Sequence, residues 1–165
     1  TSLWIAFSDD MLDLDNPDLI LRESTRISCV GALATQATYN FFKWPEILNL
    51  PEELMLDANT EKRIAKAFGL KYEEGIDLKS YKKIIKQLDF LEKIDKNDPP
   101  MFVFNNQKGG IPLTNNQKNH HPMHAKVLKD KADREGLESV VYAPKIGISN
   151  AENIDLVEFF SSKLN

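Results

Sequence analysis

The sequence of 165 residues lacks several features that would narrow its class at once. Cys29 is the only cysteine, so no intramolecular disulfide can form, and the redox compartment cannot be read from it. No apolar run approaches the roughly 18 residues that a membrane-spanning helix needs. The net charge is −4, and the lysines are scattered or fall on helix faces. We therefore expect no membrane span and no nucleic-acid partner, and the sequence predicts no cellular location.

The beginning of the chain lacks the usual methionine and starts with Thr1. Leu3, Trp4, Phe7 and Met11 recur at spacings of three and four, which predicts a helix over residues 1–12. No basic start or cleavage site of a signal peptide stands in front of this helix. The expectation is that the chain is a piece of a longer protein or that its beginning has been removed.

Three apolar segments predict strands, and helices are expected between them. The strands are predicted over 27–34, 101–104 and 137–142, each apolar on both faces. Segment 35–51 has the composition of a loop. Helices are predicted from Pro51, from Asn59 or Thr60 to Gly69, over 77–94 after an Asp77 cap, from Pro122 to Gly136, and over 151–165 with Ile154, Val157, Phe160 and Leu164 inward.

This alternation predicts an α/β protein, a three-layer α/β/α sandwich with a mostly parallel sheet. Right-handed crossovers place the connecting helices on one face of the sheet and leave only the last helix for the other. One face and one edge are then poorly covered, so we expect a broader sheet or self-association through the open edge or face.

Several stretches resemble α/β-hydrolases of the esterase and lipase type. "TSLWIAFSDDMLDLDNPDLILRESTRISCVGALATQATYN" resembles the stretch that follows the catalytic serine, and "DPPMFVFNNQKGGIP" resembles the seventh strand and the loop that supplies the acid. "GLESVVYAPKIG" resembles the eighth strand and the start of the histidine loop. The resemblance implies that residues 1–165 form one domain, the C-terminal part of such a hydrolase, with 41–96 as a helical cap-like insertion.

The same resemblance implies a small ester or acyl substrate and no cofactor, with the nucleophilic serine outside this chain. In the family pattern the acid stands four residues before the proline that ends its loop, and counting back from Pro112 gives Lys108. A cation cannot accept the imidazole N–H or stabilise an imidazolium. The loop after Tyr142 holds no histidine. By this pattern the triad is incomplete.

The three histidines, His120, His121 and His124, follow the loop that leaves the second predicted strand. His120 or His121 could serve as a substitute general base, or the pair could be structural, in contact with backbone or solvent before a helix. His120 and His124 are four residues apart, but Pro122 places His120 outside the helix and no further ligands complete a site. We expect no metal.

Polar residues that follow the predicted strands are the candidate binding residues. Gln36, Thr38 and Tyr39 follow the first strand and Asn105 follows the second, and the carboxyl ends of parallel strands are where ligands bind. These side chains could line a pocket or hold their loops by hydrogen bonds. Two functions stay open: an esterase-like hydrolase inactive in this form, and a non-catalytic binding or interaction module on a degenerate hydrolase fold.

Overall fold

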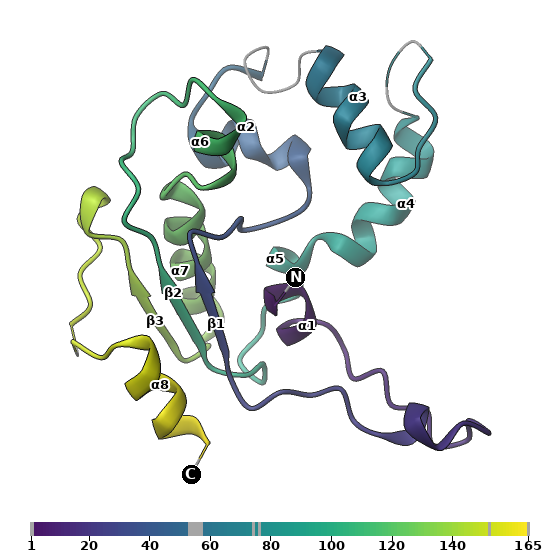
Figure 1. Ribbon diagram of the computed structural model, residues 1–165, viewed down its shortest axis with the longest axis vertical. Helices are drawn as coiled ribbons and strands as arrows, with labels where there is room; N and C mark the ends of the chain where they lie inside the picture. The colour runs from purple at the N-terminus through teal and green to yellow at the C-terminus, as the bar shows by residue number, and fades with distance from the viewer. Residues whose placement is uncertain (1, 53–57, 74, 76, 152, 165) are drawn as a thin grey trace.

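The computed structural model describes most of the chain, namely residues 2–52, 58–73, 75, 77–151 and 153–164. At its centre is a sheet of three strands, β1 (Val30–Leu33), β2 (Met101–Phe104) and β3 (Ser139–Tyr142), in the order β1-β2-β3. Both strand pairs are parallel. Helices cover both faces, so the predicted α/β class and the parallel three-layer arrangement are confirmed (Figure 1).

The first strand is shorter and more exposed than predicted. Its pairing with β2 begins at Val30, and Val30 and Ala32 are buried. Ile27 and Leu33, predicted within a strand covered on both faces, are 37% and 60% exposed. The reason is position: β1 lies at the edge of the described sheet, where neighbours cover only part of each face.

One face of the sheet is covered by α7 (Met123–Glu135) together with α1 (Ser2–Ala6), α2 (Trp44–Leu48) and α5 (Phe90–Lys93). In α7 the buried residues recur at helical spacing and are His124, Ala125, Leu128 and Ala132. The helix follows Pro122 and ends at Gly136 with φ +75°, as predicted. Helices α1, α2, α5 and α7 thus share one face of the sheet.

The other face is covered by α8 (Leu156–Lys163), which lies near the starts of the strands (Figure 1). It approaches β1 closely, because a Cβ at Gly31 would lie 2.6 Å from Leu156 Cδ1. The predicted inward stripe is wrong in part: Val157 and Leu164 are 72% and 67% exposed, whereas Phe159 is buried.

The start of α8 also differs from the prediction. The helix begins five residues later than predicted, after a capping box in which Asp155 accepts from the Glu158 N–H and Glu158 accepts from the Asp155 N–H. Because this box fixes the first turn at Leu156, the helix presents Phe159 to Phe102 of the sheet.

The segment between β1 and β2 is helical over most of its described length. It contains a 3₁₀ turn η2 (Phe41–Lys43), α2, α3 (Ala58–Ala67), α4 (Leu78–Leu88) and α5. The prediction of a loop over 35–51 is therefore wrong for 41–48, where Pro45 occupies a first helical turn that tolerates proline.

Two predicted helix starts in this segment have different outcomes. The predicted helix from Pro51 falls mainly on 53–57, outside the described residues. Asn59 and Thr60, predicted as caps, lie inside α3, whereas Asp77 caps α4 as predicted by accepting from Lys79 and Ser80 N–H. Gly69 has φ +64°, consistent with the predicted end of its helix.

The N-terminal helix ends earlier than predicted, at Ala6 rather than near residue 12. Ser8 Oγ donates to the Trp4 carbonyl at the end of this helix, and the Met11 N–H donates to Thr25 Oγ1 instead of to a helical carbonyl. The chain then leaves the sheet as an extended arm, residues 9–28, which contains the 3₁₀ turn η1 (Leu19–Arg22).

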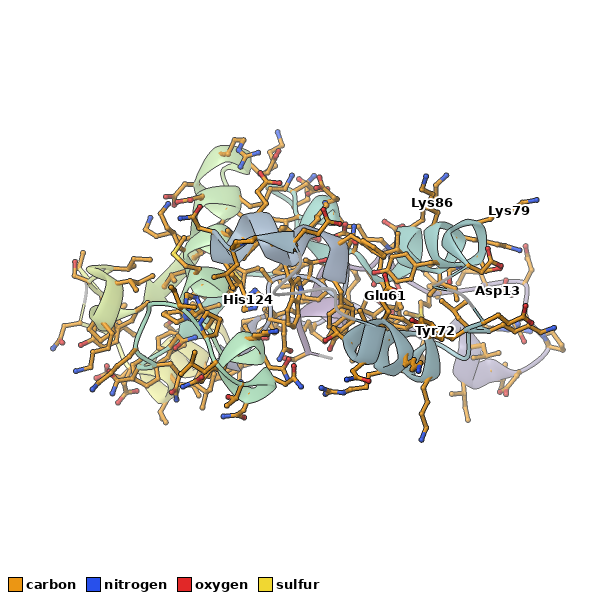
Figure 2. All side chains as sticks on the ribbon, turned by 90° about the horizontal axis from the view of Figure 1, so that it is seen from above. Asp13, Glu61, Tyr72, Lys79, Lys86 and His124 are labelled. Carbon is orange, nitrogen blue, oxygen red and sulfur yellow. The ribbon has the colours of Figure 1, made fainter. Side chains whose placement is uncertain are left out.

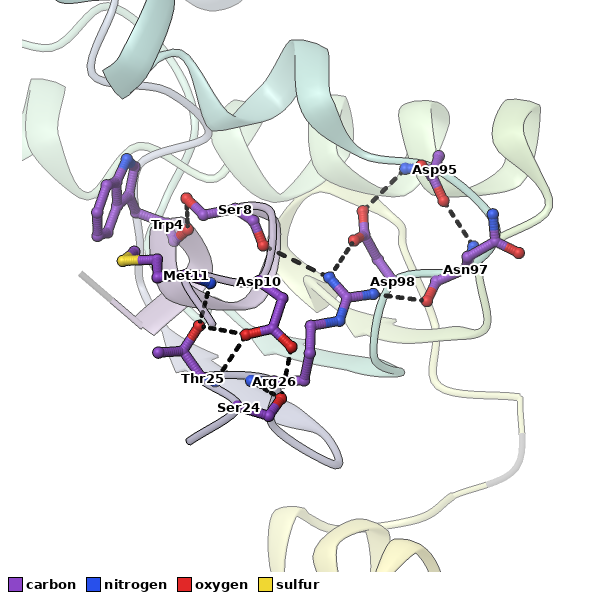
Figure 3. Close-up of polar contacts among 10 residues, drawn as sticks. All are labelled: Trp4, Ser8, Asp10, Met11, Ser24, Thr25, Arg26, Asp95, Asn97 and Asp98. Atoms are coloured by element: carbon purple, nitrogen blue, oxygen red, sulfur yellow. Dashed lines mark hydrogen bonds and ion pairs between the residues drawn. The ribbon is translucent and has the colours of Figure 1, made fainter. Parts of the chain in front are cut away.

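Two charged residues hold the base of the arm (Figure 3). The Asp10 carboxylate accepts from Ser24 Oγ at 2.6 Å and from the Thr25 N–H at 2.9 Å, and these hydrogen bonds lower its pKa to about 2. Arg26 donates to the carbonyls of Ser8 and Asn97 and pairs with Asp98 at 3.7 Å.

Among the described helices, none is long and apolar enough to cross a membrane.

Candidate functional site

The carboxyl ends of β1 and β2 lead into two loops that are held together by side chains. Asn105, directly after β2, is buried, and its Nδ2 donates to the His120 carbonyl at 3.1 Å. Its Oδ1 accepts from the Gln107 N–H at 2.9 Å. Gln36, after β1, donates to the Asn119 carbonyl at 2.9 Å. Asn105 and Gln36 thus attach the end of α6 (Asn115–Asn119) to the sheet.

Thr38 and Tyr39 connect the first of these loops to the helical segment. Thr38 is fully buried, and its Oγ1 donates to Asp89 at 2.6 Å. The Tyr39 ring packs edge-on against Phe90 at 5.4 Å between centroids. Asp89 also accepts from Asn40 and pairs with Lys43 at 2.9 Å. Side chains predicted to line a pocket therefore lie against α5 and the end of α4.

His120 is the histidine that has an accessible ring nitrogen. Its Nδ1 lies 2.6 Å from the carbonyl oxygen of Ala34, a residue with φ +46°. A carbonyl can only accept, so Nδ1 carries the proton and the neutral ring leaves Nε2 with a lone pair. His120 and Lys108 line the same cavity, whose volume is about 370 Å³. No carboxylate lines this cavity among the described residues.

His121 is held on both ring nitrogens. Its Nε2 lies 2.9 Å from the Gly110 carbonyl, and its Nδ1 accepts from the Met123 N–H at 3.3 Å. The side chain is 4% exposed. The ring therefore joins the β2 loop to the start of α7, and proton transfer at either nitrogen requires one of these hydrogen bonds to break.

His124 lies in the interior, where Figure 2 labels it between α7 and its neighbours. Its Nε2 lies 3.1 Å from the Lys118 carbonyl, and its ring meets Trp44 edge-on with centroids 4.8 Å apart. Nδ1 is buried without a hydrogen-bond partner among the described residues. Burial lowers the pKa of His124 to about 4, so the ring is neutral at neutral pH.

The orientation of the three histidine rings indicates whether they could bind a metal ion together. Each histidine directs a ring nitrogen to a different carbonyl oxygen, those of Ala34, Gly110 and Lys118. Within the described part of the chain, no three His, Cys, Asp or Glu side chains are grouped as metal ligands would be.

A larger cavity, of about 540 Å³, lies beside this region and was not anticipated from the sequence. It is bounded by α3, α6, Phe41 and Trp44. Asn115, Lys118 and Asn119 of α6 line it. This helix begins with a capping box in which Thr114 Oγ1 accepts from the Gln117 N–H. None of Gln36, Thr38, Tyr39 and Asn105 lines it. In the sequence, only the aromatic residues Phe41 and Trp44, within the segment predicted as a loop, could have pointed to this cavity.

No protein-family model matches the sequence, and no curated protein matches it significantly. Among solved structures, the chain is similar to an acetyl ester-xyloside bifunctional hydrolase from Caldicellulosiruptor lactoaceticus, with 13% sequence identity and a TM-score of 0.47. The matched region covers 86% of this chain and 40% of that chain. The present chain thus spans less than half the length of that hydrolase.

Proposed function

We propose that this chain is the C-terminal part of an esterase-like α/β-hydrolase domain that binds a small ester or acyl ligand without hydrolysing esters by itself. The parallel order β1-β2-β3, with binding loops at the carboxyl ends of the strands, supports the fold. The observation that carries the loss of catalysis is the bonding of the histidines: each of His120, His121 and His124 directs a ring nitrogen to a backbone carbonyl oxygen.

The chemistry of ester hydrolysis explains why this bonding matters. In a Ser-His-acid triad a carboxylate orients the imidazole and stabilises the imidazolium that forms when serine loses its proton. The Ala34 carbonyl can orient His120, but it carries no net charge to stabilise an imidazolium. Lys108, at the position expected for the acid, shares the cavity of His120 and adds a positive charge beside it. Among the described residues, no carboxylate lines this cavity to stabilise an imidazolium formed at His120.

The test is hydrolysis of p-nitrophenyl acetate and p-nitrophenyl butyrate by the purified chain. We expect p-nitrophenol release at the same rate for the wild type and for His120→Ala, because His120 lacks an acid partner. His121→Ala is the matched control for loss of an imidazole that is bonded on both nitrogens. Turnover by the wild type that either substitution abolishes would overturn the proposed lack of catalysis.

A second candidate function is binding without chemistry, as a ligand or interaction module. The cavity of about 540 Å³ favours it, because its size is that of small-molecule sites and its lining contains none of the three histidines. Direct ligand binding, independent of any ester substrate, distinguishes this role from residual catalysis.

A further inference from the structure

The larger cavity combines an apolar floor with a basic rim. The floor is formed by Phe41, Trp44 and Ile64, and the basic side chains are Arg63, Lys66 and Lys118. Among the described residues that line it, none is acidic. The cavity therefore presents positive charge next to apolar surface.

Two of the cations make no ion pair with a described residue, unlike the lysines of α7. Lys126, Lys129 and Lys131 on α7 each pair with a carboxylate four residues later. Arg63 and Lys66 on α3 make no ion pair with any described residue. Exposed cationic side chains are commonly solvated. Arg63 and Lys66, however, flank the same cavity, and none of the described residues that line it is acidic. An anion in the cavity would complement both.

The floor presents apolar surface with its polar atom already satisfied. The Trp44 indole N–H donates to the Thr38 carbonyl at 3.0 Å, and the side chain is 3% exposed. The Phe41 ring lies 4.7 Å from the Trp44 ring. Phe41, which is partly exposed, therefore supplies most of the accessible aromatic surface, and Trp44 packs behind it without a free hydrogen-bond donor. A small, strongly hydrated anion would match the rim but leave this floor uncovered.

We propose that this cavity binds a small amphipathic anion, a carboxylate or sulfonate attached to an aromatic or acyl body. The body covers Phe41 and Trp44, while Arg63 and Lys66 bind the anionic group. This inference deepens the binding role proposed above by naming the class of ligand and the residues that select its charge.

The experiment compares two dyes that share an aromatic body and differ in charge. 8-Anilinonaphthalene-1-sulfonate is the anion, and N-phenyl-1-naphthylamine is its neutral counterpart. Each is titrated into the full chain while energy transfer from tryptophan is monitored, because Trp44 lines the cavity. We expect the sulfonate to bind about 10-fold more tightly than the neutral dye, the effect of one charge-assisted contact.

Three variants locate the site and its charge selectivity. Arg63→Gln is expected to raise the Kd of the sulfonate by about 3- to 10-fold and leave the neutral dye unchanged. Lys86→Gln removes the same charge from α4, where the side chain projects outward, and is expected to change neither Kd (Figure 2). Ala67→Trp fills the cavity from the end of α3 and should abolish the sensitised emission of both dyes.

The outcomes separate this inference from the proposed function. Equal Kd values for the two dyes, or equal effects of Arg63→Gln and Lys86→Gln, would overturn the charge selectivity while leaving a binding role intact. No binding, or binding that persists in Ala67→Trp, would overturn the site itself. Far-UV circular dichroism and urea unfolding show whether each variant keeps the wild-type fold, and the ester assay is unaffected by any of these results.

Discussion

At the scale of single residues, His124 is the group whose surroundings most constrain its chemistry. It is fully buried, with Nε2 against the Lys118 carbonyl and the Trp44 ring beside it. A charged imidazolium there would lose its hydration, and the nearby His121 and His120 would add repulsion if protonated. The pKa of His124 is therefore about 4, below the usual 6.5.

This shift predicts a loss of stability in mild acid. Below pH 6.5 His124 becomes protonated in the unfolded chain, whereas in the folded chain it stays neutral down to about pH 4. The free energy of unfolding therefore falls as the pH is lowered across this interval. We expect a decrease of about 2 kcal/mol between pH 7 and pH 5 from this residue. Urea unfolding of the wild type and His124→Gln measures it: the variant should be less pH-dependent by that amount. Parallel curves for the two proteins would contradict the assignment.

At the level of single residues, the sequence could predict only those features that depend on nearby residues of the chain. The sequence indicates His120 and His121 as candidates because they follow a loop at the end of a predicted strand, and they do lie beside that loop. For His124 the sequence suggests only a role as a metal ligand. Its burial depends on Trp44, which comes from a segment predicted as a loop, so the packing that determines its pKa was not visible in the sequence.

At the scale of secondary structure elements, Asp89 connects three separate pieces of chain. It lies between α4 and α5, is 7% exposed, and accepts from Thr38 and Asn40 of the loop after β1. Lys43 of η2 pairs with it at 2.9 Å and also contacts the exposed Glu92. One carboxylate thus satisfies donors from the sheet loop and from the helical segment, which fixes the two relative to each other.

We expect Asp89→Ala to lower the free energy of unfolding by about 3 kcal/mol, because buried donors and a cation would lose their acceptor. Glu92→Gln is the matched control: it removes the other carboxylate bound to Lys43, but at a position where the side chain is 64% exposed. Its expected effect is below about 1 kcal/mol. Urea unfolding measures both, and equal losses would show that burial of Asp89 is not what makes its contacts important.

Helix ends that are marked by their own residues were predicted well. Features that depend on contacts between distant segments of the chain were not. Asp77, Gly69 and Gly136 mark ends of helices through their own side-chain or backbone chemistry, and their roles agree with the sequence. The inward stripe predicted for α8 is wrong in part, because its phase depends on a capping box and on Gly31 across the sheet. The early end of α1 depends likewise on contacts with residues 24–26.

At the scale of the whole molecule, the parallel sheet was predictable and the larger cavity was not. Alternation of apolar strands with helices allows few topologies, and the chain adopts the expected one. The cavity is built from 41–44, 60–67 and 115–119, which are distant in sequence and meet only after folding. No periodicity within any one of these segments signals a binding site, so its apolar floor and basic rim emerge only from the tertiary structure.

The arm and the edge of the sheet predict concentration-dependent self-association. Leu19 and Ile20 are 68% and 78% exposed, and no described strand pairs with the outer edge of β1. We expect the mean mass in light scattering to rise with concentration, and Leu19→Ser with Ile20→Ser to reduce that rise without lowering the free energy of unfolding. Ile111→Ser with Leu113→Ser removes two equally exposed apolar residues outside the arm and serves as control. A strict monomer at high concentration would contradict this prediction, and equal effects of the two double variants would exclude the arm as the surface of contact.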